Sequence, residues 1–76
     1  MERRATSRQW VLRAGTIEFD GRSIDCVVRN ISATGAAFDL SSPIPNKVTL
    51  NFVTSHERQN CNVVWRQQRR VGVTFN

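Results

Sequence analysis

The sequence has no apolar run that approaches the roughly 20 residues of a membrane-spanning helix. Its first residues are charged, and no signal-peptide-like apolar segment follows them. Histidine occurs once, as His56, and Cys26 and Cys61 stand far from any C-x-x-C spacing. These absences disfavour a membrane protein, a secreted precursor and a zinc protein, so we expect a cytoplasmic protein without a metal site.

A recognisable set of catalytic residues is also missing. His56 has no evident nucleophile as a partner, and no glycine-rich phosphate loop followed by lysine occurs in the chain. We therefore predict that the protein is not an enzyme and needs no cofactor. Its function is expected to be binding.

Lysine is nearly absent, because ten of the 11 basic residues are arginine and only Lys47 is lysine. The formal net charge is +5 and the isoelectric point is near 11.1. The planar guanidinium group can grip a phosphate or the acceptor edge of a guanine, and it can stack on a base. The composition favours an anionic partner that contains bases, with a solvated basic surface as the alternative.

The apolar residues alternate with polar ones in short runs, which is the pattern of β-strands. Asp20 and Gly21 form a two-residue hairpin signal, and Pro43 and Pro45 interrupt the chain because proline cannot donate to a strand ladder. No helical period exceeds one turn. The runs predict six strands, at residues 12–19, 23–29, 36–40, 48–52, 61–65 and 71–75.

Six short strands with one apolar face each predict an all-β fold, a small six-stranded antiparallel β-barrel. Gly15 and Gly72, inside strand patterns, are expected to mark bulges or corners. At 76 residues the chain is one domain, with residues 1–9 as a flexible basic arm and residues 10–76 as the barrel.

Several core positions follow from the same alternation. Cys26 alternates with Ile24 and Val28, and Cys61 alternates with Val63, so both cysteines are predicted to be buried thiols rather than a disulfide. Trp65 continues the second series and is predicted to lie in the core. Stacking on a base is the alternative for Trp65 and for Trp10.

Two polar motifs do not resemble packing residues. Arg4 and Arg8 form R-x-x-x-R before the first strand, and Asn30, Ser32 and Gly35 form N-x-S-x-x-G after the second. Together they resemble the signature of PilZ domains, bacterial receptors for the second messenger cyclic di-GMP. The stretches CVVRNISATGAAFDL and CNVVWRQQRRVGVTF are also similar to PilZ sequences, so the resemblance covers nearly the whole chain.

The resemblance implies that cyclic di-GMP is the ligand and that both motifs bind it. Arg4 and Arg8 are then expected to hold a guanine Hoogsteen edge and a phosphate, and the adjacent Arg3 adds a contact or is a surface charge. The arm would become ordered around the ligand and so transmit the signal.

The turn motif has expected roles of its own. Asn30 and Ser32 would offer hydrogen bonds to a base or to the backbone, and Gly35 would adopt a positive φ and admit the ligand. The ordinary alternative for these three residues is a turn.

PilZ domains often carry a helix after the last strand, and this chain ends there, so we expect either a piece of a longer protein or a stand-alone adaptor. A downstream protein partner or a fused domain is expected, and ligand-bridged dimerisation is an alternative output.

Two alternative functions remain. One is a basic barrel that binds single-stranded nucleic acid, which is disfavoured because few aromatic residues lie outside the core. The other is a PilZ-like barrel whose partner is a protein.

Overall fold

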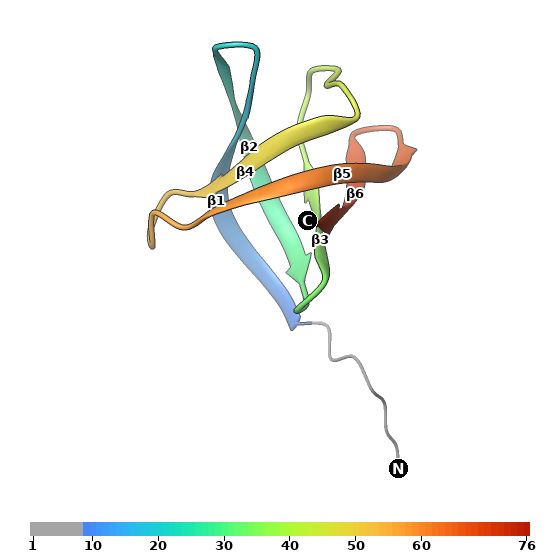
Figure 1. Ribbon diagram of the computed structural model, residues 1–76. Helices are drawn as coiled ribbons and strands as arrows, with labels where there is room; N and C mark the ends of the chain where they lie inside the picture. Colours follow the sequence, from blue (N-terminus) through green and yellow to red (C-terminus); the bar gives the residue numbers. More distant parts are fainter. Residues whose placement is uncertain (1–8) are drawn as a thin grey trace.

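The computed structural model describes the backbone of residues 9–76 and the side chains of residues 11–76. The described residues form a closed antiparallel barrel with the strand order β1-β2-β3-β6-β5-β4 and contain no helix that could cross a membrane (Figure 1). The predicted all-β, six-stranded antiparallel barrel is confirmed. The strands are β1 (Gln9–Phe19), β2 (Arg22–Ile31), β3 (Gly35–Asp39), β4 (Lys47–Phe52), β5 (Arg58–Gln67) and β6 (Arg70–Phe75).

The β1–β2 hairpin turns at the two residues that the sequence indicated. Phe19 pairs with Arg22, and the intervening Asp20 and Gly21 have φ values of 50° and 74°. Two consecutive positive φ values give the turn a twist that matches the twist of the flanking strands. The hairpin prediction is therefore confirmed.

The barrel interior is filled by alternate residues from all six strands. The largest fully buried side chains are Phe38, Ile17, Leu50, Val28 and Cys61. Cys26 is also buried, and both cysteines are free thiols, as predicted. Burial raises the pKa of both thiols, that of Cys26 to about 12. Among the described residues, no three metal-ligating side chains form a group that could hold an ion.

The strand register shifts at three places. At each shift, the side chains that follow along the strand point to the opposite face of the sheet from the one that strict alternation would give. The shifts lie between Trp10 and Arg13 in β1, between Val28 and Asn30 in β2, and between Val63 and Trp65 in β5. Gly15 lies at none of them, so of the bulge or corner expected there, the bulge is absent. Gly15 instead faces Cys26 and Leu50, where an added Cβ would lie 3.3 Å from the Cys26 sulfur.

Trp65 is not a core residue, which corrects the prediction from its alternation with Val63. Val63 pairs with Val73, whereas Trp65 pairs with Gly72, so Val64 is an extra residue in β5. The bulge moves Trp65 to the face opposite the core, because one extra residue reverses the side on which every later side chain points. Trp65 is 43% exposed.

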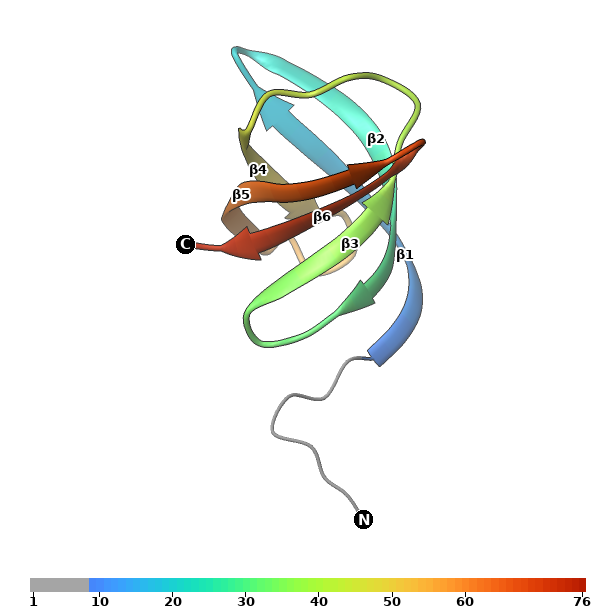
Figure 2. The same cartoon turned by 90° about the vertical axis from the view of Figure 1, so that its right-hand side faces the viewer.

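The two ends of the barrel differ in what they carry. At one end, the β2–β3 turn lies beside the start of β1 and the end of β6, and the Phe75 amide donates to the Thr34 carbonyl at 2.8 Å (Figures 1 and 2). At the other end, the β5–β6 hairpin lies against the segment that follows β3, where the Leu40 amide donates to the Arg69 carbonyl at 3.0 Å.

Candidate functional site

Asn30 is the one buried polar side chain among those that the structure describes, with 7% exposure. It lies near the end of β2, where its backbone partners are Trp10 in β1 and Ala37 in β3. Buried amide groups are costly unless they are hydrogen-bonded, so the barrel holds Asn30 in a defined position. A polar group fixed in this way is suited to recognition.

A bulge at Arg29 sets the direction of Asn30. Val28 pairs with Phe38 and Asn30 pairs with Ala37, so Arg29 is an extra residue in β2 with no counterpart in β3. Val28 therefore faces the core while Asn30 lies on the outer face beside Ala37. Bulges commonly redirect side chains in this way at the rims of barrels and near binding sites.

Ser32 stabilises the turn between β2 and β3 through hydrogen bonds within the turn. Its hydroxyl oxygen accepts a hydrogen bond from the Thr34 amide at 3.3 Å, and the hydroxyl donates to the Gly35 carbonyl at 3.4 Å. The Ser32 amide donates to the same Gly35 carbonyl at 2.8 Å. The hydroxyl thus has a role in the turn itself, which is the ordinary alternative for this residue, and it remains partly exposed.

Gly35 is required by the close approach of two strands. A Cβ atom at this position would collide with the carbonyl oxygen of Val73 in β6. The positive φ expected for Gly35 is not adopted, since Gly21 is the one described glycine with a positive φ. The reason for glycine is therefore strand packing, not a left-handed backbone conformation.

Four residues lie in one register row on the outside of the barrel, and we call them the outer row. Asn30 pairs with Ala37, Ala37 with Gly72, and Gly72 with Trp65, so the row crosses β2, β3, β6 and β5. Ala37 is only 2% exposed although it lies outside the core cluster. An added Cβ on Gly72 would overlap the Trp65 indole, so the ring lies across the glycine. The outer row is a narrow strip with an amide at one end and an indole at the other.

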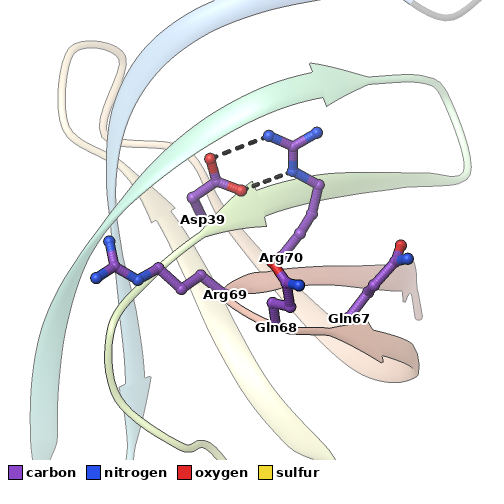
Figure 3. A pocket seen from close by; sticks show the side chains of 5 residues that line it. All are labelled: Asp39, Gln67, Gln68, Arg69 and Arg70. Carbon is purple, nitrogen blue, oxygen red and sulfur yellow. Dashed lines mark hydrogen bonds and ion pairs between the residues drawn. The ribbon is translucent and has the colours of Figure 1, made fainter.

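Two arginines and an aspartate border the outer row. Arg70 donates to the Asp39 carboxylate through Nε at 2.7 Å and through Nη2 at 3.2 Å (Figure 3). Arg29 Nη1 lies 3.6 Å from the same carboxylate. The hydrogen bond from Arg70, together with the nearby positive charges, holds the pKa of Asp39 below its ordinary value. The group therefore carries one net positive charge at neutral pH.

The predicted arginines of the arm, Arg3, Arg4 and Arg8, lie outside the described residues, as does the predicted flexibility of the arm. The described chain begins at Gln9, which the sequence placed in the arm but which is the first residue of β1. Gln9 pairs with Ile31, the residue before Ser32. The point at which the N-terminal segment joins the barrel is therefore next to the β2–β3 turn.

Asn30, Ser32 and Gly35 lie at the end of β2, in the β2–β3 turn and at the start of β3, and their role in binding a ligand stays a prediction. The sequence did not predict the position of Trp65, because the bulge in β5 is what places this side chain on the outer row. The isolated Gly72 opposite a large aromatic residue was the available signal, since a glycine in a strand often marks the close approach of another group.

A comparison with protein-family models gives a match to the PilZ domain over residues 2–76. The chain belongs to the PilZ domain family. This family comprises receptors for cyclic di-GMP, so the coarse function is that of a receptor domain. No curated protein matches the chain. In this PilZ domain, the N-x-S-x-x-G residues lie at the end of β2, in the turn, and at the start of β3.

Proposed function

We propose that this PilZ domain binds cyclic di-GMP on the outer face of the barrel, where the outer row, the β2–β3 turn and the N-terminal segment meet. The observation that carries this proposal is the pairing of Trp10 with Asn30. Trp10 follows Arg8 by two residues, and Asn30 begins the N-x-S-x-x-G motif. The register thus sets the start of β1 beside Asn30, and this supports a shared site for the two motifs.

The chemistry of the ligand matches the residue types of both motifs. Cyclic di-GMP has two phosphates and two guanines, and each guanine presents O6 and N7 as a pair of acceptors. Arg4 and Arg8 supply planar donors for one guanine edge and one phosphate, and Arg3 supplies a further contact. Asn30 provides a fixed amide, and Ser32 a hydroxyl at the edge of the same surface.

Trp65 extends this surface to a second base. One face of its indole lies on Gly72, and the side chain is 43% exposed. An aromatic ring held flat on a sheet is a stacking platform for a guanine. The outer row thus supports binding of one guanine near Asn30 and stacking of another on Trp65.

The N-terminal segment, which joins the barrel at Gln9, is the proposed route of the signal. If Arg4 and Arg8 bind the ligand, the residues before Gln9 are drawn against the barrel, and anything joined to them is reoriented. The charge-assisted hydrogen bonds offset the entropy that this ordering costs. The output passes to a protein partner or a fused domain, with ligand-bridged dimerisation as the alternative route.

Single-stranded nucleic acid is the second candidate ligand, because Trp65 is an aromatic residue outside the core. Nucleic-acid barrels, however, usually align several stacking residues along a basic groove. Trp65 is the one exposed large aromatic side chain among those described. A compact dinucleotide therefore fits this surface better than a long strand.

Isothermal titration calorimetry tests the proposal with three ligands: cyclic di-GMP, GTP and a short oligothymidylate. We expect saturable binding of cyclic di-GMP, weaker binding of GTP, and weak binding of the oligonucleotide. Affinity for cyclic di-GMP should fall with a slope of no more than about two in a plot of log affinity against log salt, because the ligand carries only two phosphates. A steeper slope, or tighter binding of the oligonucleotide, would favour the second candidate.

A further inference from the structure

The end of the barrel opposite the β2–β3 turn carries a concentration of arginines. Arg66 lies near the end of β5, Arg69 is in the β5–β6 turn, and Arg70 begins β6. With Gln68, the other turn residue, we call these residues the hairpin surface. Gly35 and Asp39 are the two ends of β3, about 13 Å apart for four residues of strand, so the hairpin surface is well separated from the β2–β3 turn.

Three hydrogen-bonded contacts connect the hairpin surface to the rest of the barrel. Arg66 donates through Nη2 to the Asn46 side-chain oxygen at 3.0 Å, and Arg70 is held by Asp39. The carbonyl of Arg69 accepts the Leu40 amide. Arginine side chains normally lose much freedom on binding, so Arg66, which Asn46 already positions, binds an anion at lower entropic cost.

Arg69 is the least constrained of the three arginines. Its side chain extends away from Arg70 and Asp39 (Figure 3), and it forms no ion pair with any other described residue. It borders three hollows, of about 440, 320 and 280 Å³. The hollow of 320 Å³ also contains Arg66 and the apolar side chains of Leu40 and Pro43.

We propose that the hairpin surface docks an acidic segment of a partner protein, with carboxylates paired to Arg66 and Arg69 and a small apolar side chain against Pro43. Three neighbouring hollows open to solvent suit successive side chains of a polypeptide, whereas a metabolite site encloses most of its ligand. The charge is complementary, because Asp39 is already neutralised by Arg70.

Nucleic acid fits the hairpin surface less well. No aromatic side chain lines any of the three hollows, so bases have nothing to stack on. Docking at the hairpin surface uses none of the residues proposed to bind cyclic di-GMP. The two proposals are therefore tested independently.

The chain contains a matched control for this surface. A separate hollow of about 440 Å³ also carries two arginines, Arg22 and Arg58. There, however, Glu18 pairs with Arg58. A double variant with Arg22→Gln and Arg58→Gln removes the same charge as one with Arg66→Gln and Arg69→Gln. Any effect of net charge alone is therefore equal in the two variants.

The test is fluorescence anisotropy with a dye-labelled peptide of eight glutamates, at physiological salt, with an eight-nucleotide oligothymidylate as competitor. We expect saturable binding to the wild-type domain and about tenfold weaker binding to the Arg66→Gln, Arg69→Gln variant. The control double variant should stay within about twofold of wild type. Circular dichroism confirms that both variants are folded, and Arg69→Gln alone, which leaves the Asn46 contact intact, should already weaken binding.

Three outcomes would overturn the inference. The peptide does not bind saturably, both double variants lose affinity equally, or the oligonucleotide displaces the peptide more effectively than unlabelled peptide does. The second outcome would reduce the effect to net charge, and the third would assign the hairpin surface to nucleic acid.

Discussion

The indole of Trp65 lies across Gly72, the residue that pairs with it in β6. This contact covers an outward-facing glycine and leaves the other side of the ring exposed. It depends on two local features, the bulge at Val64 and the missing side chain at position 72. Trp65 is thereby placed at one end of the outer row, with Asn30 at the other.

Replacing Gly72 by alanine should displace the indole, because the new Cβ would overlap the ring. We expect a loss of about 1 to 2 kcal/mol in the free energy of unfolding, measured by urea denaturation. In a Trp10→Phe background, the fluorescence of Trp65 should shift to longer wavelength, and cyclic di-GMP should bind more weakly. Thr74→Ala, at the next outward position of β6, is the control. An unchanged emission spectrum in Gly72→Ala would contradict the contact.

The strands and their turns were readable from the sequence because each depends on neighbouring residues. The Asp20–Gly21 turn and the alternation of core residues are local patterns, and the structure has both. The direction of Trp65 was not readable, since an extra residue in β5 is recognised only against its partner strand, β6. Two valines and a tryptophan in succession look the same with or without a bulge.

The candidate site was partly readable for the same reason. Ser32 and Gly35 belong to one turn, and their order in the sequence is enough to group them. The proximity of the start of β1 to Asn30 required the register of β1 with β2. The reason for glycine at position 35 was also hidden, because the colliding Val73 carbonyl belongs to a strand almost forty residues later.

The arginines of the R-x-x-x-R motif should be essential for ligand binding. Arg4→Ala and Arg8→Ala are each expected to weaken cyclic di-GMP binding by about 2 to 4 kcal/mol, as does the removal of one partner from a desolvated charge pair. Calorimetry measures this loss, and the circular dichroism spectrum should stay native. Arg22→Ala removes an equal charge at the far hairpin and should change binding little. Native affinity in both motif variants would eliminate the proposed site.

Hydrogen exchange should report the proposed ordering of the N-terminal segment. Amides of residues 2–8 are expected to exchange more slowly in the presence of saturating cyclic di-GMP than in its absence, because the bound arginines hold the segment against the barrel. The barrel strands should change little. Asn30→Ala should reduce the slowing at a fixed ligand concentration. If the segment is equally protected with and without ligand, the signal must leave by another route, such as dimerisation.

The stability of the domain should depend on pH through Asp39. Its pKa is lowered in the folded protein by the hydrogen bond from Arg70, below the ordinary value of 3.8. Its ion pairs therefore stabilise the fold above that ordinary value, and the contribution is lost as the pH falls through the lowered pKa. Asp39→Asn should cost up to about 1 kcal/mol at neutral pH, since the pair is partly exposed.

The comparison of unfolding curves checks this pH dependence. The difference between wild type and Asp39→Asn should shrink as the solution is acidified well below pH 3.8. Asp20→Asn, which changes a turn carboxylate that pairs with no other described residue, serves as the control. A difference that stays constant across the acid range would show that Asp39 acts through shape and not through charge.

The most direct test of the account is to map cyclic di-GMP onto the domain by two-dimensional ¹H–¹⁵N NMR during a titration. We predict that the largest shifts occur at the amides of Gly35, Ala37 and Gly72 and at the indole N–H of Trp65. These groups lie in the β2–β3 turn and along the outer row. Shifts that leave these four signals unchanged, or that cluster instead at Gln68 and Arg69, would contradict the proposed site.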